Sequence, residues 1–220
     1  METPSNPTSK ANARALTSAL FRAIWGVQAH GFERWQDVRG PAIVVANHLS
    51  LLDGPMLAAF TPVPLHYAVT GDFARRQPWQ FLLDMLAATG HGSYTPLDPA
   101  KPLGMRHLHK ALRDGRWVGI FPEGAISTTG RLGEIQPGVL RLAAATQATL
   151  LPVRISGAHQ TVFGKLSRQE REALAGEPIE LRAQPPIPYP GDEAAAMREI
   201  RRALEPTAFG AWGIASRHAA

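Results

Sequence analysis

The chain alternates between short runs of aliphatic and β-branched residues and longer segments with helical periodicity, and this alternation constrains the fold more than any other feature. The runs expected to be strands are 42–46, 65–69, 92–97, 117–121, 150–155 and 179–183. The segments expected to be helices are 51–60, 79–88, 104–113, 139–146 and 193–204. Strands that alternate with helices are typical of an α/β domain with a mostly parallel central sheet flanked by helices. We predict this fold for residues 37–220.

The segment before this alternating region has a different character. Residues 1–10 are polar and contain two prolines, and we predict that they are disordered. Residues 11–36 are predicted to form an amphipathic helix, because apolar side chains recur at helical spacing between Leu16 and Val27. This helix either packs on the domain or lies at a membrane surface, where basic residues beside Trp and Phe are favoured.

Composition excludes several classes of protein. Cysteine is absent, which excludes disulfides, thiolate zinc sites and cysteine nucleophiles. No run of apolar residues approaches the roughly 18 that a membrane-spanning helix needs. The N-terminus lacks the apolar core of a signal peptide, so we do not expect export. The net charge of +5 either reflects an anionic partner, such as nucleic acid or an anionic membrane surface, or is an unremarkable surplus on a chain of 220 residues.

A histidine and a carboxylate follow the first expected strand directly, as His48 and Asp53. Ligands of α/β sheets bind at the carboxyl ends of strands. A non-helical turn around residues 48–50 would bring the Asp53 carboxylate onto the His48 imidazole, and such a pair is a competent general base. The same two residues also occur at this spacing by chance, in which case the histidine only caps a helix.

The strand expected at 117–121 also ends in a polar turn. The groups there that could contact a ligand are the side chains of Glu123, Thr128, Thr129 and Arg131, and the backbone of Gly124. Hydroxyls, backbone N–H groups and a guanidinium in a Gly- and Thr-rich turn can hold an anion. Each turn is ordinary alone, but their placement at two strand ends makes the combination informative.

Four segments in this order resemble the glycerolipid acyltransferase family. They read NHLSLLDGPMLAAF, YTPLDPAKPLGMRHL, GIFPEGAISTTGRL and LLPVRISGAHQTVF. Within that family they look most like the acyltransferase portion of bacterial 2-acylglycerophosphoethanolamine acyltransferase/acyl-ACP synthetase. The likeness spans about residues 41–165.

The resemblance implies a reaction. His48 would deprotonate the free hydroxyl of a lysophospholipid, and Asp53 would orient His48. The resulting oxygen would attack the thioester carbonyl of acyl-ACP or acyl-CoA, which serves as co-substrate; neither a metal nor another cofactor is implied. Glu123 and Gly124 would bind and position the acceptor. From their chemistry we add Thr128, Thr129 and Arg131 as ligands of the headgroup phosphate.

The resemblance also implies partners and a location. The partners would be a membrane lysophospholipid and an acyl carrier protein or CoA thioester. The protein would be cytoplasmic and peripheral on the inner face of the cell membrane. No AMP-forming synthetase domain follows residue 220, so the thioester is expected to be made elsewhere.

The segments depart from the family pattern at positions that bear on the acceptor. Relatives carry Arg directly after Pro-Glu-Gly or one place later, where this chain has Ala125 and Ile126. The phosphate contact is therefore lost, or moved to Arg131, Arg106 or Arg154. We expect lysophosphatidylethanolamine as acceptor. The alternatives are lysophosphatidic acid, a phosphate-free lipid alcohol, or a lipid-binding protein without catalysis.

Other patterns predict no further chemistry. His107 and His109 are two residues apart on an expected helix, a poor spacing for a shared metal. The arginine pairs at 75–76 and 201–202 lack the aromatic-interleaved basic face of a nucleic-acid module. We therefore predict neither a metal site nor a nucleic-acid partner.

Overall fold

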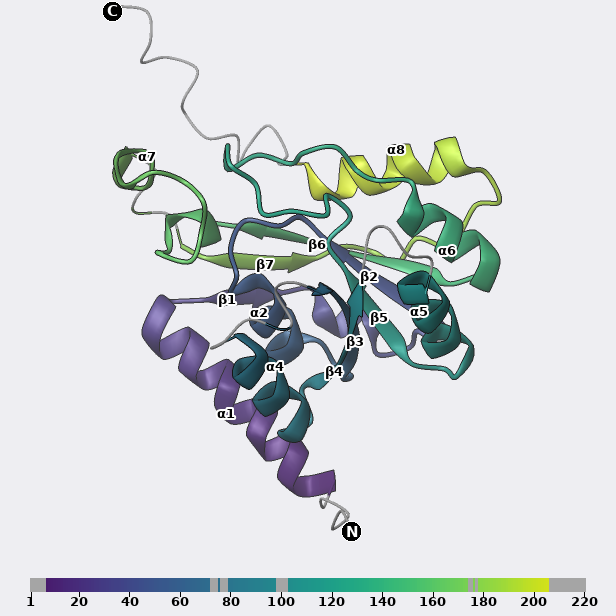
Figure 1. Ribbon diagram of the computed structural model, residues 1–220, viewed down its shortest axis with the longest axis horizontal. Helices are drawn as coiled ribbons and strands as arrows, with labels where there is room; N and C mark the ends of the chain where they lie inside the picture. Colours follow the sequence, from purple (N-terminus) through teal and green to yellow (C-terminus); the bar gives the residue numbers. More distant parts are fainter. Residues whose placement is uncertain are drawn as a thin grey trace, which may run out of the picture.

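A seven-stranded sheet runs through the part of the chain that the structure describes, with helices on both of its faces (Figure 1). The structure is a computed structural model that describes residues 7–71, 75, 79–97, 103–173, 176 and 178–205. The strands are β1 (Gln28–His30), β2 (Ala42–Ala46), β3 (Leu65–Thr70), β4 (Gly92–Leu97), β5 (Trp117–Ile120), β6 (Thr149–Ser156) and β7 (Glu180–Ala183). Their order is β1-β7-β6-β2-β5-β3-β4, and each neighbouring pair is parallel except β6–β7. The predicted mostly parallel α/β sheet is confirmed.

Helices lie between most successive strands, and one helix precedes β1 and another follows β7. They are α1 (Pro7–Trp25), α2 (Asp53–Phe60), α4 (Trp79–Ala88), α5 (Leu103–Arg113), α6 (Gly138–Thr146), α7 (Arg168–Ala173) and α8 (Glu193–Leu204), with the 3-10 turns η1 (Phe32–Trp35) and η2 (Ala158–Gln160). The five helices predicted between residues 51 and 204 all form, within about two residues of their predicted bounds. The short surface helix α7 was not predicted, because none of its residues is buried and it has no apolar face to recognise.

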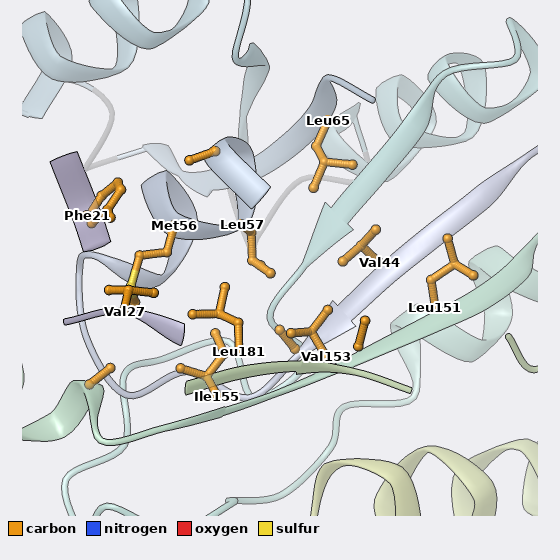
Figure 2. Packing of buried hydrophobic residues seen from close by; sticks show 14 of the residues in the cluster. Phe21, Val27, Val44, Met56, Leu57, Leu65, Leu151, Val153, Ile155 and Leu181 are labelled. Atoms are coloured by element: carbon orange, nitrogen blue, oxygen red, sulfur yellow. The ribbon is translucent and has the colours of Figure 1, made fainter. Parts of the chain in front are cut away.

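Side chains of β2 alternate between two hydrophobic cores. Val44 faces the core formed with α1, α2 and η1, while Ile43 and Val45 face the core formed with α5, α6 and α8. Figure 2 shows the first core, where Phe21 and Met56 lie near Val27, and side chains of β6 and β7 complete the cluster. Successive side chains of a strand point to opposite faces of the sheet, so a continuous apolar run such as 42–46 fits a central strand covered on both faces.

The N-terminal helix is shorter than predicted and starts earlier. It ends at Trp25, because Gly26 adopts a φ of +63°, a left-handed conformation that commonly terminates helices. Residues 28–30 then pair in parallel with β7, so the expected helix 11–36 contains a strand and belongs to the sheet domain. Of the residues predicted to be disordered, 7–10 are helical and 1–6 lie outside the described residues.

Helix α1 packs along α2 through one side of its surface (Figure 1). Phe21 is buried in the core, and the Arg14 guanidinium donates to the backbone carbonyl of Thr61 at the end of α2. Leu16, Leu20 and Ile24 remain exposed on the other side. No helix of the described ranges is both long and apolar enough to cross a membrane.

Candidate active site

The chain leaves the central strand β2 at Asn47. The Asn47 side chain makes the hydrogen bonds to β6 that the backbone of β2 makes up to this point. Its carboxamide donates from Nδ2 to the carbonyl of Ile155 at 2.9 Å and accepts at Oδ1 from the Ile155 N–H at 2.7 Å. The buried carboxamide thus satisfies the β6 backbone beyond the last paired residues, Ala46 and Val153. The backbone of the next residue, His48, is therefore free to turn away from the sheet.

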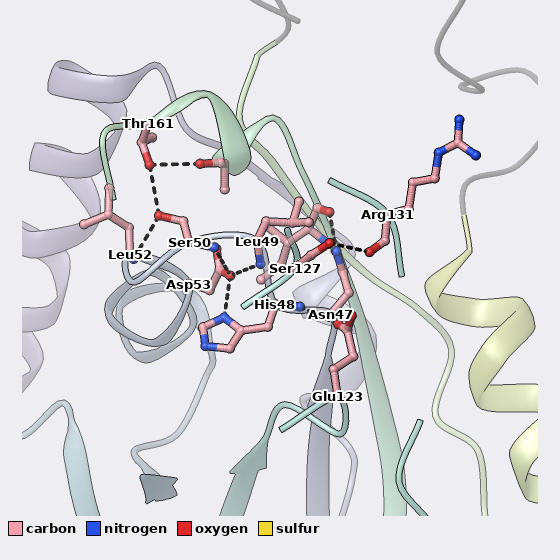
Figure 3. Close-up of polar contacts among 12 residues, drawn as sticks. Asn47, His48, Leu49, Ser50, Leu52, Asp53, Glu123, Ser127, Arg131 and Thr161 are labelled. Atoms are coloured by element: carbon pink, nitrogen blue, oxygen red, sulfur yellow. Dashed lines mark hydrogen bonds and ion pairs between the residues drawn. The ribbon is translucent and has the colours of Figure 1, made fainter. Parts of the chain in front are cut away.

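His48 and Asp53 form a close pair at the carboxyl end of β2 (Figure 3). The Asp53 Oδ2 atom lies 2.9 Å from His48 Nδ1, and it also accepts the backbone N–H groups of Leu49 at 2.6 Å and Ser50 at 2.8 Å. The turn at 48–52 is not helical, and this allows two residues five positions apart to meet. Asp53 is fully buried and begins α2, where the helix dipole favours a negative charge.

This contact determines which nitrogen of His48 can act on a ligand. A carboxylate only accepts hydrogen bonds, so Nδ1 carries the proton and donates it to Asp53. Nε2 of the neutral ring then has a free electron pair. The His48 side chain is 17% exposed, and Figure 3 shows Nε2 pointing away from Asp53. The arrangement is that of a general base held by a carboxylate.

The ring of Phe121 lies flat against the His48 imidazole. The ring centroids are 4.0 Å apart and the planes are inclined by 14°. Phe121 directly follows β5, which pairs with β2, so the two residues come from adjacent strand ends. The stack restricts the orientation of the imidazole, and the face of an aromatic ring also favours a neighbouring cation.

Glu123 links the two strand ends through backbone hydrogen bonds. Its Oε1 accepts the N–H of His48 at 2.8 Å, and its Oε2 accepts the N–H of Gly133 at 2.6 Å. A further bond, from the N–H of Ser127 to the carbonyl of His48 at 2.8 Å, fixes the same backbone from the other side. Burial raises the pKa of the Glu123 carboxyl, while both backbone bonds oppose that rise. In this structure the carboxylate positions His48.

The remaining predicted ligand residues lie in the turn after Gly124, where hydrogen bonds within the turn hold Thr129 and Arg131. Ser127 Oγ donates to the carbonyl of Arg131 at 2.8 Å, and Thr129 Oγ1 accepts the Arg131 N–H at 3.4 Å. Thr128 and Thr129 are exposed. Figure 3 shows the Arg131 side chain pointing away from His48. The structure thus brings His48, Asp53 and Glu123 together, and it does not bring the Arg131 guanidinium to them.

A buried histidine beneath this turn was not singled out from the sequence. His159 lies in η2, and a Cβ placed on Gly130 would be 3.7 Å from its ring. Burial lowers the pKa of His159, while the charge of Asp53 opposes that effect. Asn47 and Phe121 also occur in the segments that resemble the family, but the sequence predicts no role for either. Within the described ranges, no three His, Asp or Glu side chains lie close enough together to hold a metal ion.

Comparison with known proteins connects these residues to a family. A family model described as Acyltransferase matches residues 26–156. The chain is 25% identical over 146 residues to the chloroplastic 1-acyl-sn-glycerol-3-phosphate acyltransferase LPAT1 of Arabidopsis thaliana. That match covers 66% of this chain and 40% of the plant protein, so the chain spans less than half the length of that relative.

A solved structure has the same fold. It is the 1-acyl-sn-glycerophosphate acyltransferase PlsC from Thermotoga maritima, with a TM-score of 0.64 and 18% sequence identity. The match covers 92% of this chain and 83% of that one. At this level of identity the likeness concerns the arrangement of the sheet and its helices.

Proposed function

Because the chain belongs to the acyltransferase family, we propose that it transfers a fatty acyl chain from a thioester to the free hydroxyl of a lysophospholipid. The observation that carries this proposal is the pair of His48 Nδ1 and Asp53 Oδ2, 2.9 Å apart at the carboxyl end of β2. It leaves Nε2 as a base at a partly open position. The donor is acyl-ACP or acyl-CoA.

The proposed reaction moves one proton and one acyl group. Nε2 of His48 takes the proton of the acceptor hydroxyl while the hydroxyl oxygen attacks the thioester carbonyl. The carbon–sulfur bond breaks as the tetrahedral intermediate collapses, and the imidazolium gives its proton to the departing thiolate. The products are an ester and a free thiol. Asp53 stabilises the imidazolium between the two steps, and the Phe121 ring adds to that stabilisation.

Two acceptors are supported by different observations. Lysophosphatidylethanolamine is favoured by the branch of the family that the four sequence segments resemble most. Ala125 stands where relatives of that branch usually carry arginine, Ile126 stands where phosphatidic-acid-forming relatives carry it, and the Arg131 side chain points away from His48. The loss of a bidentate phosphate contact makes glycerol-phosphate-type acceptors such as lysophosphatidic acid less favourable. The second candidate is lysophosphatidic acid, because the plant relative is named for 1-acyl-sn-glycerol-3-phosphate and the Thermotoga protein for 1-acyl-sn-glycerophosphate.

The test is an assay with purified protein, an acyl thioester and separate acceptors, in which thiol release and the acylated product are both measured. The acceptors are lysophosphatidylethanolamine, lysophosphatidic acid and a monoacylglycerol, each with acyl-ACP and with acyl-CoA. We expect most turnover with lysophosphatidylethanolamine. Turnover with lysophosphatidic acid and with no other acceptor would show that lysophosphatidic acid is the acceptor in place of lysophosphatidylethanolamine. No product with any pair, from protein that is folded, would overturn the proposed activity. The variant Asp53→Asn, which lacks the carboxylate that orients His48, measures the background rate of thiol release.

We further propose that α1 holds the protein on the inner face of the cell membrane. Leu16, Leu20 and Ile24 are 63%, 48% and 61% exposed and lie four residues apart, so they form one stripe along the helix. Residues 7–25 contain three basic residues and no Asp or Glu. An apolar stripe on a helix of net positive charge suits a surface of anionic lipid.

Point substitutions test this role better than truncation. Removing residues 1–36 would also remove Phe21, Val27 and Trp35 from the hydrophobic core. The substitution Leu20→Asp leaves the core intact, and we expect it to reduce co-sedimentation with vesicles that contain phosphatidylglycerol. Ala144→Asp on α6, far from α1 in Figure 1, is the control. Equal vesicle binding by wild type and Leu20→Asp would contradict this placement.

A further inference from the structure

Val162 is the most exposed of the large hydrophobic side chains that the structure describes. Its exposed fraction is 75%, and the other exposed large hydrophobic side chains are Leu16, Leu20 and Ile24 of α1 and Met105 of α5. Val162 stands at the tip of a turn, residues 161–165, that follows β6 and η2. Phe163 beside it is half-buried, so the turn offers two apolar side chains next to each other.

The 161–165 turn is attached to the catalytic loop, residues 47–52, which carries His48 and leads into Asp53. Ser50 Oγ lies 2.9 Å from Thr161 Oγ1 (Figure 3). The Leu51 N–H donates to the carbonyl of Phe163 at 3.1 Å. Ser50 and Gly164 also form an antiparallel bridge. Ser50 is only two residues from His48, so the turn has a fixed position relative to the general base.

Close contact at Gly164 makes this attachment tight. A Cβ at this position would lie 2.8 Å from the carbonyl oxygen of His159 and 3.3 Å from that of Leu49. Any larger residue would push the turn away from the catalytic loop. The exposed position of Val162 is therefore a consequence of rigid packing beneath it.

Charge and neighbouring side chains indicate what covers this tip. The 161–165 turn carries one charge, that of the exposed Lys165, and no carboxylate. Leu51 and Leu52 on the adjoining catalytic loop are half-buried apolar residues. Figure 1 places this region near one end of α1, which also has an exposed apolar stripe, a net positive charge and no acidic residue. Apolar side chains beside lysine and arginine suit an anionic lipid surface.

We propose that the 161–165 turn is a second lipid-contacting element, in which Val162 enters the surface of an anionic bilayer and Lys165 lies among the headgroups. This inference rests on the proposed function, since it explains how a base on a soluble domain reaches an acceptor that stays in the membrane. Contact at α1 alone would let the domain rotate about the helix. A second contact, joined to Ser50, sets the direction in which His48 faces the bilayer.

The absence of native cysteine allows a direct test on the whole chain. The variant Val162→Cys carries an environment-sensitive bimane label, and Met105→Cys on α5 carries the same label as control. With vesicles of phosphatidylcholine and phosphatidylglycerol, we expect a blue shift and quenching by spin-labelled lipid at position 162 and neither at position 105. An unchanged label at position 162 on vesicle-bound protein overturns the proposal, as does a lack of vesicle binding by the labelled and unlabelled proteins.

A second measurement separates lipid contact from damage to the catalytic loop. Val162→Asp is expected to weaken vesicle affinity by about tenfold, the effect of losing the burial of one apolar side chain. Val162→Leu should bind at least as well as wild type, and Met105→Asp should bind like wild type. Equal vesicle affinity of Val162→Asp and wild type overturns the proposal.

Turnover distinguishes this inference from the proposed function. With a dissolved short-chain acceptor, Val162→Asp should match wild type, whereas with an acceptor in vesicles it should be slower. Equal losses in both assays would place the effect in the catalytic loop and overturn the lipid contact. If wild type acylates no acceptor while the label at 162 still enters vesicles, the proposed activity fails and the lipid contact stands.

Discussion

The carboxamide of Asn47 and the backbone of Ile155 form two hydrogen bonds across the end of the sheet, 2.9 and 2.7 Å long. The side chain continues the pairing of β2 with β6 after the backbone has stopped pairing. The position of His48 follows from this contact, because the chain turns at the residue between β2 and His48. A side chain with no direct part in the proposed chemistry thus sets where the base stands.

Asn47→Asp tests that contact. The substituted carboxylate can still accept the Ile155 N–H, but its second oxygen faces the Ile155 carbonyl without a proton to donate. We expect a loss of about 2–3 kcal/mol in the free energy of unfolding, measured by urea denaturation at neutral pH. Asn12→Asp on the exposed side of α1 is the matched control. Equal stability of the two variants would show that the contact contributes little.

Glu123→Gln distinguishes a positioning role from direct binding of the acceptor. The glutamine has one oxygen and one NH2 group, so either the His48 N–H or the Gly133 N–H loses its acceptor. We expect the unfolding free energy to fall by about 1–3 kcal/mol and kcat to fall while KM changes little. If KM for the lysolipid rises with stability and kcat unchanged, Glu123 contacts the acceptor as the family resemblance implies.

Phe121→Leu tests the stack on His48. Leucine keeps an apolar side chain at the strand end but loses the aromatic face that lies 4.0 Å from the imidazole. An aromatic face stabilises a cation by roughly 0.5–2 kcal/mol, so we expect kcat to fall by about 2–30-fold. Phe121→Tyr retains the ring and should stay close to wild type. Equal rates for the leucine and tyrosine variants would leave the ring with a packing role only.

His66 predicts a loss of stability in acid that is independent of the candidate site. Its ring nitrogens lie 2.6 Å from Ser93 Oγ and 2.7 Å from Thr95 Oγ1, and burial, with Arg116 and His107 nearby, lowers its pKa to about 4. The unfolded chain binds a proton near pH 6.5, so the stabilisation is complete above about pH 6.5 and is lost as pH falls toward the folded pKa.

The expected size of this effect is about 2–3 kcal/mol between pH 6.5 and the folded pKa. Urea denaturation across that pH range measures it, with His66→Gln as the comparison. On acidification the variant should lose less stability than wild type. Its plot of unfolding free energy against pH should be less steep, by an amount that corresponds to roughly one bound proton. Parallel curves for the two proteins would show that His66 titrates normally in the folded chain.

Most of the fold could be predicted because each element carries its own pattern. The apolar run at 42–46 and the helical period at 193–204 identify β2 and α8 without any knowledge of their neighbours. β1 could not be found in this way, since residues 28–30 form a strand only through pairing with β7. The end of α1 did carry a signal, the glycine at 26, which the longer helix prediction passed over.

The residues of the site also differ in whether the sequence alone could predict their contacts. His48 and Asp53 lie close in sequence, so their meeting could be anticipated from one turn. Asn47 and Phe121 depend on which strands are adjacent and on where each side chain points. The family resemblance implies that Glu123 contacts the acceptor. Its two hydrogen bonds to backbone N–H groups could not be predicted, because they form only where the loops from β2 and β5 lie together.

The most direct test of the account is turnover by His48→Ala. Purified wild type and variant are compared in single-turnover acyl transfer from a thioester to lysophosphatidylethanolamine, with product and thiol quantified and folding checked by circular dichroism. Removal of the general base and of the imidazolium that protonates the thiolate should slow transfer by about 10²–10⁴-fold. Transfer by folded His48→Ala at the wild-type rate would contradict the assignment of His48 as the base.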